Sequence, residues 1–342
     1  MRKMSAILVW LVLAVVCATA SASAAEPTVS GIAPMSGTVN LWHSGRVPAA
    51  TKNVNNSDGP NFMPNMEVFA VEAGVKPKGA VVICPGGAFA FRSVQNEGYD
   101  VASMLTGLGY QCFVVNYRIQ PYTMRESATD LQRAIRYVRA HASDYRISPE
   151  NIALVGFSAG GILNGEVLLN WRGVTNASAI DGSYQPDELD AVPVSACAVG
   201  MIYSFYGRLS VSMNDVETLH AANLPPAFYC WGTRDGFAGQ FAQNSSAVRA
   251  AGCAVETHVL QNYPHGYGTG GSVAVWGRDF DAFLEPIMRS NEAAVDEAAT
   301  DAAAENVQAV YSVDGKRVPE GSARKGIYVV KTTKGSKKIA IR

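Results

Sequence analysis

The sequence predicts an α/β fold, with a mostly parallel central sheet covered by helices on both faces, followed by a small β module. Three observations predict it. From about residue 79 to 288, short apolar runs alternate with helical patterns, as in chains that build parallel sheets. The runs show little alternation of apolar and polar residues, as expected of strands buried on both faces. An acidic, alanine-rich stretch then separates this region from a basic, strand-rich tail.

The composition limits the classes of function. The chain has 342 residues, of which 48% are hydrophobic and 17% are charged, and these values fit a globular protein with a sizeable core. Its formal net charge is -1, so no bulk electrostatic attraction to nucleic acid or to an anionic membrane surface is expected.

The first 25 residues have the pattern of a signal peptide. Arg2 and Lys3 precede an apolar run at 6–16, which is short for a membrane span, and Ala-Ser-Ala at 22–24 offers a cleavage site. We therefore expect a secreted, periplasmic or cell-surface protein with no stable membrane span after cleavage. A retained N-terminal anchor is the alternative.

The main domain is expected to cover residues 26–290. Within it, strands are expected at 80–84, 112–117, 152–155, 225–231 and 254–260, and helices at 97–108, 128–142, 159–169 and 273–288. Right-handed crossovers between parallel strands bring the carboxyl ends of these strands to one edge of the sheet. Residues that directly follow a strand are therefore the candidates for a functional site.

Five cysteines remain once the signal peptide is removed, and an odd number cannot all pair within one chain. They are Cys84, Cys112, Cys197, Cys230 and Cys253, each in or beside an apolar run. We expect buried free thiols that behave as small hydrophobic groups, with one disulfide left open as an option for an exported chain. No cysteine pair has the spacing of a zinc site, and no metal is expected.

The C-terminal part divides into two segments. Residues 291–305 carry five acidic residues and no Lys or Arg, which predicts a solvated linker that could be transiently helical. Residues 306–342 then predict a small β module with a hairpin at Lys334-Gly335. The stretches 310–318 and 325–331 resemble the C-terminal sorting modules of secreted Bacteroidetes proteins, which implies a contact with secretion machinery. A plain accessory β module is the alternative.

One motif predicts a nucleophile. Gly156-Phe157-Ser158-Ala159-Gly160 is the only G-x-S-x-G pattern in the chain, with an apolar strand before it and a helical pattern after it. This is the strand–turn–helix setting in which a serine hydroxyl is presented on a sharp turn. Ser158 is therefore the candidate nucleophile, and an ordinary glycine-rich turn is the alternative.

A serine hydroxyl needs a base, and in this type of fold the base is a histidine late in the chain. His265 lies in a loop beside Gly266, whereas His258 lies within an expected strand and His220 precedes the expected acid. We therefore expect His265 to be the base. A surface histidine is the alternative.

The acid that orients the base is expected between the serine and the histidine. Asp235 comes shortly after the strand expected at 225–231, at the carboxyl end where such an acid belongs. It is preferred to the acids of a less regular region, namely Asp181, Asp187, Asp190 and Asp215. A turn residue is the alternative role for Asp235.

Backbone N–H groups must stabilise the oxyanion that forms during acyl transfer. One is expected from Ala159, directly after the nucleophile, and others from the loop after the first core strand. That loop contains Pro85-Gly86-Gly87-Ala88-Phe89, so Gly87 and Ala88 are the expected donors. A flexible glycine turn is the alternative.

These motifs resemble the esterase/lipase branch of the α/β-hydrolases, which includes acetyl xylan esterases and related carbohydrate and feruloyl esterases of Bacteroidetes. The resemblance covers about residues 40–290 and is carried by 81–89, 96–99, 114–118, 130–135, 156–161 and 224–228. In two places the chain departs from it. Pro85 stands where a histidine often opens the oxyanion loop, and Ala88 stands where a third glycine is frequent.

The resemblance implies the α/β-hydrolase fold and a serine esterase that needs no metal or organic cofactor. Its implied substrates are acyl esters, with acetyl preferred, on plant polysaccharides such as xylan or on their oligosaccharides. A feruloyl esterase, a serine peptidase of the prolyl oligopeptidase kind and a non-catalytic carbohydrate-binding protein remain the alternatives.

Overall fold

The structure is a computed structural model. It describes residues 25, 27–29, 32–43, 46–52, 54–171, 174, 176–304, 307–313, 317–318, 326–332 and 335–341. The expected signal peptide therefore lies outside the described residues, apart from residue 25.

The central sheet has eight strands in the order β1-β2-β4-β3-β5-β6-β9-β10. Strands β1 and β2 join it antiparallel, whereas every pair from β4 to β10 is parallel. The bounds are β1 Ser36–Asn40, β2 Asn65–Phe69, β3 Gly79–Cys84, β4 Tyr110–Asn116, β5 Ile152–Phe157, β6 Val199–Ile202, β9 Ala227–Gly232 and β10 Val255–Leu260. The mostly parallel sheet predicted from the apolar runs is confirmed.

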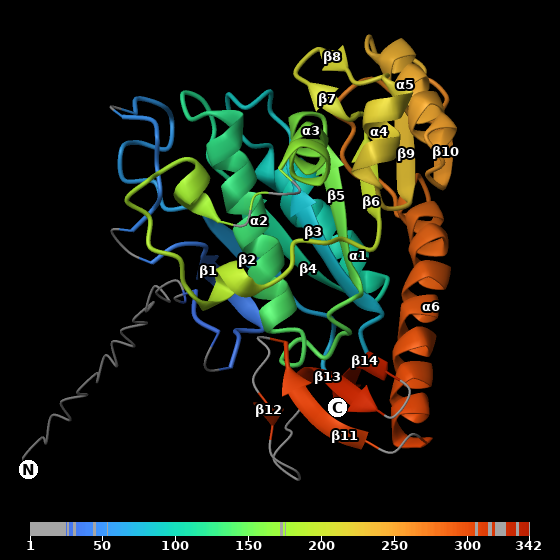
Figure 1. The fold of residues 1–342 in the computed structure, drawn as a ribbon. Helices are drawn as coiled ribbons and strands as arrows, with labels where there is room; N and C mark the ends of the chain where they lie inside the picture. The colour runs from blue at the N-terminus through green and yellow to red at the C-terminus, as the bar shows by residue number, and fades with distance from the viewer. Residues whose placement is uncertain are drawn as a thin grey trace, which may run out of the picture.

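Helices cover both faces of this sheet, as parallel strands require. Helix α2 crosses in front of β3 and β4 in Figure 1 and contacts α3, while α6 runs down the right-hand side of the view and its Gly277 lies close to Met104 of α1. The α-helices are α1 Asp100–Gly107, α2 Met124–Ala140, α3 Ala159–Gly165, α4 Val216–Ala222, α5 Ala238–Ala250 and α6 Gly277–Ala304. The shorter helices are η1 Val94–Tyr99, η2 Glu166–Asn170, η3 Ala177–Ala179 and η4 Glu188–Ala191. In the described part of the chain, no helix is long and apolar enough to cross a membrane.

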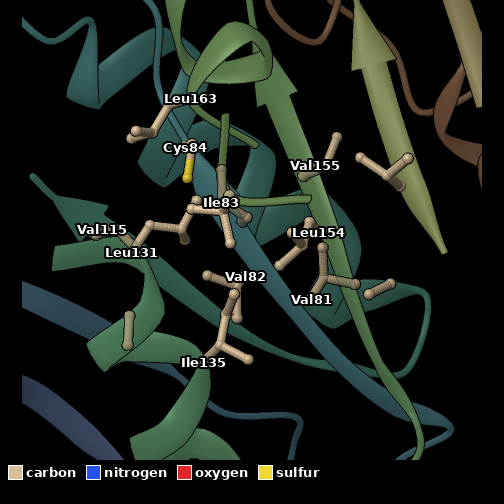
Figure 2. Packing of buried hydrophobic residues seen from close by; sticks show 14 of the residues in the cluster. Val81, Val82, Ile83, Cys84, Val115, Leu131, Ile135, Leu154, Val155 and Leu163 are labelled. Carbon is tan, nitrogen blue, oxygen red and sulfur yellow. The ribbon is translucent and has the colours of Figure 1, made fainter. Parts of the chain in front are cut away.

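The core lies between the sheet and these helices. Every residue of β3 and of β5 is buried. Figure 2 shows Val82 of β3 close to Ile135 of α2, with Leu154 of β5 on the neighbouring strand. Burial of one such side chain stabilises the fold by about 1.5–3 kcal/mol. The two strands that precede the expected oxyanion loop and the expected nucleophile are thus held firmly in the core.

The sequence missed several elements and misplaced one helix. It did not predict β1, β2, β6, α4 or α5, nor the two-stranded hairpin of β7 Gly207–Arg208 and β8 Val211–Ser212. The helix expected at 273–288 begins at Gly277 and continues to Ala304. Alanine and glutamate are strong helix formers, so the acidic stretch expected as a linker extends α6.

The tail forms a second sheet with the strand order β12-β11-β13-β14. Its strands are β11 Val307–Ser312, β12 Arg317–Val318, β13 Gly326–Thr332 and β14 Gly335–Ile341, and β13 and β14 pair antiparallel as the expected hairpin. This module lies at the end of the central sheet opposite to α3 (Figure 1). Lys338 approaches Glu150 of the main domain at 3.6 Å.

The five cysteines of the described chain are all free. Cys84, Cys112 and Cys230 are buried, and Cys197 and Cys253 are half-buried. The expectation of free thiols is confirmed, and burial raises the pKa of Cys197 to about 12, where the thiol stays protonated and unreactive at neutral pH.

Candidate active site

Ser158 occupies a strained turn between β5 and α3. Its backbone has φ 50° and ψ -118°, a conformation in which a non-glycine residue is disfavoured. A Cβ on Gly160 would lie 1.9 Å from the carbonyl oxygen of Cys84, and a Cβ on Gly156 would lie 2.5 Å from that of Gly160. The two glycines of the motif are therefore required by close backbone contacts, which fix where the serine hydroxyl points.

Ser158, His265 and Asp235 form one continuous chain of hydrogen bonds. Nε2 of His265 lies 2.9 Å from Oγ of Ser158, and Nδ1 lies 2.7 Å from Oδ2 of Asp235. Because an ionised carboxylate only accepts hydrogen bonds, the ring proton sits on Nδ1. Nε2 is then free to accept the proton of the serine hydroxyl.

The sheet order explains how these distant residues meet. Asp235 follows β9 and His265 follows β10, two neighbouring parallel strands, while Ser158 follows β5 at the same edge. The carboxylate of Asp235 is fully buried and also accepts the backbone N–H of Phe237 at 2.9 Å. The His265 side chain is 36% exposed, so solvent and substrate can reach the ring.

The rival histidines are engaged elsewhere. His258 pairs with Glu256 and with Asp279, and Nδ1 of His220 lies 2.9 Å from the carbonyl oxygen of Ala251. Neither lies at the Ser158 hydroxyl.

The rival acids also have other partners. Asp187 binds Arg133, Asp190 binds Arg136, Asp181 accepts from Ser183, and Asp215 caps the start of α4. Of the five candidate acids, Asp235 is the one that contacts His265.

The expected oxyanion loop lies beside the nucleophile. Cys84 at the end of β3 is in register with Gly156 at the end of β5, which brings the following loop next to Ser158. Ala88 and Phe89 both have a positive φ, 53° and 57°, so the loop is a tight, strained turn. Among the described residues, nothing accepts a hydrogen bond from the N–H of Gly87, Ala88 or Ala159. These three groups can therefore donate to a bound oxygen.

Sequence reasoning did not single out Glu97, which the structure places beneath the oxyanion loop. The carboxyl group is buried, and it accepts the N–H of Gly86 at 2.7 Å and the hydroxyl of Tyr203 at 2.7 Å. Burial raises the pKa of Glu97, while the hydrogen bonds from Tyr203 and Gly86 offset part of the rise. A glutamate near a helix start is usually exposed, so although 96–99 is one of the stretches that carry the family resemblance, no pattern marked Glu97 as buried.

Tyr203 lies under the histidine. Its ring centroid is 4.9 Å from that of His265, and its hydroxyl accepts the N–H of Gly268 at 3.1 Å. Phe205 and Tyr206, which follow Tyr203 closely in the chain, are also buried in the core. Tyr203 therefore packs against the His265 ring from the core side. All three aromatic side chains are buried, so none of them presents an exposed surface to a substrate.

Among the described side chains, no group of three or more His, Cys, Asp or Glu residues gathers as metal ligands would.

The chain is similar to several known proteins. Residues 66–226 match the family model described as BD-FAE. The chain is 36% identical over 85 residues to the acetylxylan esterase of Xylanibacter ruminicola, a match that covers 25% of this chain and 18% of that protein. It is 38% identical over 81 residues to the probable carboxylic ester hydrolase LipM of Mycobacterium tuberculosis, covering 23% of this chain and 19% of that protein. The matched segment thus spans less than a fifth of each of these relatives.

A solved structure extends the likeness to most of the chain. The acetyl ester-xyloside bifunctional hydrolase of Caldicellulosiruptor lactoaceticus superposes with a TM-score of 0.58 at 24% identity, covering 75% of this chain and 98% of that one. At this level of identity the likeness shows the fold. The chain therefore has the α/β-hydrolase fold, and its residues 66–226 are similar to the BD-FAE family model.

Proposed function

We propose that the chain is a secreted serine esterase. It removes acyl groups, with acetyl preferred, from plant polysaccharides such as xylan or from their oligosaccharides. Ser158 is the nucleophile, His265 is the general base and acid, and Asp235 orients His265. The observation that carries this proposal is the hydrogen-bonded chain from the Ser158 hydroxyl through His265 to the buried Asp235 carboxylate.

In the first step the Ser158 oxygen attacks the ester carbonyl while Nε2 of His265 takes the hydroxyl proton. The carbonyl oxygen becomes an oxyanion, for which Ala159, Gly87 and Ala88 offer unpaired N–H groups. Each donor of this kind contributes about 3–4 kcal/mol to transition-state stabilisation. The tetrahedral intermediate then collapses, and the sugar leaves as an alcohol after taking the proton from His265.

In the second step water replaces the alcohol. His265 removes a proton from the water, which attacks the acyl-serine carbonyl, and the same N–H groups hold the new oxyanion. Collapse releases the carboxylic acid and returns the proton to Ser158. Asp235 stays ionised throughout and stabilises the imidazolium that forms in both steps.

The substrate class rests on two observations. The His265 side chain is 36% exposed at the rim of the sheet, which suits an ester carried on a bulky polymer. The similar proteins are named as an acetylxylan esterase and an acetyl ester-xyloside hydrolase. Export is supported by the N-terminal pattern of residues 1–25 alone, and the tail is proposed to serve as the address for the secretion machinery.

The test compares Ser158→Ala with Ser246→Ala, because Ser246 is an exposed serine of α5 that bonds only within its helix. Both variants are assayed on p-nitrophenyl acetate and on acetylated xylan. Ser158→Ala should lose nearly all turnover in a folded protein, and Ser246→Ala should keep it. Wild-type turnover in Ser158→Ala would remove Ser158 from the mechanism.

The same preparation is then tested on feruloylated oligosaccharides and on a prolyl peptide. Acetate release should exceed ferulate release, and the peptide should remain intact. Faster ferulate release would make the chain a feruloyl esterase, while peptide cleavage would favour a peptidase.

A further inference from the structure

Glu97 joins the two loops that the proposed reaction needs. Its Oε2 accepts the N–H of Gly86 at 2.7 Å, and Gly86 is the second residue of the expected oxyanion loop. Its Oε1 accepts the Tyr203 hydroxyl at 2.7 Å, and that hydroxyl in turn accepts the Gly268 N–H at 3.1 Å. Gly268 lies three residues after His265, so one carboxyl group ties both loops together.

The Glu97 carboxyl group is closely packed against the backbone of Gly86. A Cβ on Gly86 would lie 2.8 Å from Oε2 of Glu97 and 2.6 Å from the carbonyl oxygen of Phe157. The glycine thus lets the loop backbone press directly onto the carboxyl group and onto the strand that ends at Ser158.

The histidine loop is held from the same helix by a second contact. Asn96, the neighbour of Glu97 in η1, donates to the carbonyl oxygen of Gly266 at 3.2 Å. On its other side, Trp276 donates to the carbonyl oxygen of Gly268 at 2.9 Å. The backbone just after His265 is therefore held at two points, Gly266 and Gly268, and η1 contributes one of the two contacts.

Burying a carboxyl group costs free energy that a neutral side chain in a purely structural role would not. Within the described part of the chain, no Lys or Arg side chain pairs with Glu97, and an unpaired buried charge is disfavoured. A carboxylate differs from an amide in two useful respects. Both of its oxygens accept hydrogen bonds, and its negative charge attracts the imidazolium of His265, with which it interacts electrostatically.

We propose that Glu97 is a positioning residue of the active site, acting through Gly86 on the oxyanion donors and through Tyr203 on the His265 loop. The inference rests on the proposed esterase function and adds a member to its machinery. It assigns to Tyr203 the role of the link between Glu97 and the histidine loop.

The test uses Glu97→Gln and Tyr203→Phe, with Tyr110→Phe as the matched control. Tyr110 also donates its hydroxyl to a carboxylate, that of Asp281 at 2.7 Å, but it stands at the start of β4, the end of the sheet away from Ser158. Tyr203→Phe and Tyr110→Phe remove a hydroxyl, Glu97→Gln replaces one accepting oxygen with a donating amide group, and all three changes keep the shape of the side chain. On p-nitrophenyl acetate, Glu97→Gln and Tyr203→Phe should each lower kcat by up to about 10²-fold with a smaller effect on KM.

The control should lose thermal stability but keep kcat within about twofold of the wild type. The double variant Glu97→Gln/Tyr203→Phe should lose less than the product of the two single losses, because both changes break one chain of contacts. Wild-type kcat in both single variants, or a loss no larger than that of Tyr110→Phe, would overturn the proposal. Strictly multiplicative losses would overturn the link through Tyr203.

Hydrogen exchange tests the same proposal without relying on catalytic activity. Amide exchange in peptides covering 85–93 and 261–276 should accelerate in Glu97→Gln and stay unchanged in Tyr110→Phe. Unchanged exchange in Glu97→Gln would contradict the positioning role. A wild-type protein with no turnover of p-nitrophenyl acetate would count against the esterase function, while this exchange experiment would still decide the role of Glu97.

Discussion

At the scale of single residues, the site is built from strain and from burial. Ser158 is held at a positive φ by its glycine neighbours. Asp235 is shielded from water, and its carboxylate lies against the ring of His265. A buried carboxylate interacts more strongly with an imidazolium than an exposed one does, because water does not screen the pair. In the proposed mechanism, the exposure of His265 therefore serves access of the substrate, and the burial of Asp235 serves its electrostatic effect on His265.

Replacement of Asp235 tests this division. Asp235→Asn keeps the size of the side chain but favours the wrong tautomer of His265 and no longer stabilises its charged form. We expect kcat on p-nitrophenyl acetate to fall by about 10⁴-fold, the size of the effect for an acid in this role. A loss of less than tenfold in a folded variant would show that Asp235 does not orient the base.

The raised pKa of Glu97 gives a pH-dependent prediction. A carboxyl group whose pKa is higher in the folded than in the unfolded state stabilises the fold below its unfolded pKa, and this stabilisation is lost as the pH rises through the folded value. Glu97→Gln lacks this titration. The Tm of the wild type should therefore fall relative to that of Glu97→Gln as the pH rises above the ordinary pKa of a glutamate, about 4. A difference in Tm that stays constant as the pH rises would contradict it.

The sequence pointed to residues that a local pattern marks and did not point to Glu97, whose partners meet it only in the fold. Ser158 could be found because its motif constrains adjacent residues, and His265 and Asp235 because chain order and strand ends restrict the choice. Glu97 meets Tyr203 across 106 positions of the chain, and no local pattern announces that contact.

At the scale of elements, the site depends on how closely α3 approaches the ends of β3 and β5. Gly160 makes that approach possible, since its Cα faces the carbonyl oxygens of Cys84 and Pro85. A helix that stood farther away would carry the N–H of Ala159 with it and widen the oxyanion site.

Two alanine substitutions separate this effect from helix propensity. Gly160→Ala introduces a Cβ at 1.9 Å from the Cys84 oxygen, and we expect a loss of about 1–3 kcal/mol in the free energy of unfolding together with most of the activity. Gly239→Ala in α5 places its Cβ in open space and should raise the free energy of unfolding by up to about 1 kcal/mol. Denaturant titration and ester turnover measure both. Full activity in Gly160→Ala would disprove the need for close approach.

The sequence predicted the strands of the buried centre better than the elements at its edges. Residues 80–84 and 152–155 are continuous apolar runs because helices cover both faces there. Strands β1 and β2 join antiparallel at one edge, where polar residues such as Asn65 and Glu67 interrupt the pattern. Strand β6 has only four residues, one of them Gly200, which is too short for its period to stand out.

At the scale of the whole molecule, the site and the C-terminal module occupy opposite ends of the central sheet (Figure 1). The triad stands at the carboxyl ends of the parallel strands, whereas the module approaches Glu150 in the turn that precedes β5. The proposed active site and the proposed sorting module are therefore far apart in the structure.

Truncation tests this separation. A chain that lacks residues 306–342 should keep kcat on p-nitrophenyl acetate within about twofold, because none of the described residues of the module contacts the triad, although its Tm should fall as buried surface is lost. Loss of most turnover in a truncated protein that is still folded would show that the module supports the site.

The most direct test of the account is covalent labelling with a fluorophosphonate, followed by mass spectrometry of the intact protein and of its peptides. We predict a single adduct on Ser158 in the wild type, none in Ser158→Ala, and much slower labelling in Asp235→Asn. A folded wild-type protein that stays unlabelled, or an adduct on another serine, would contradict the claim that Ser158, His265 and Asp235 act together.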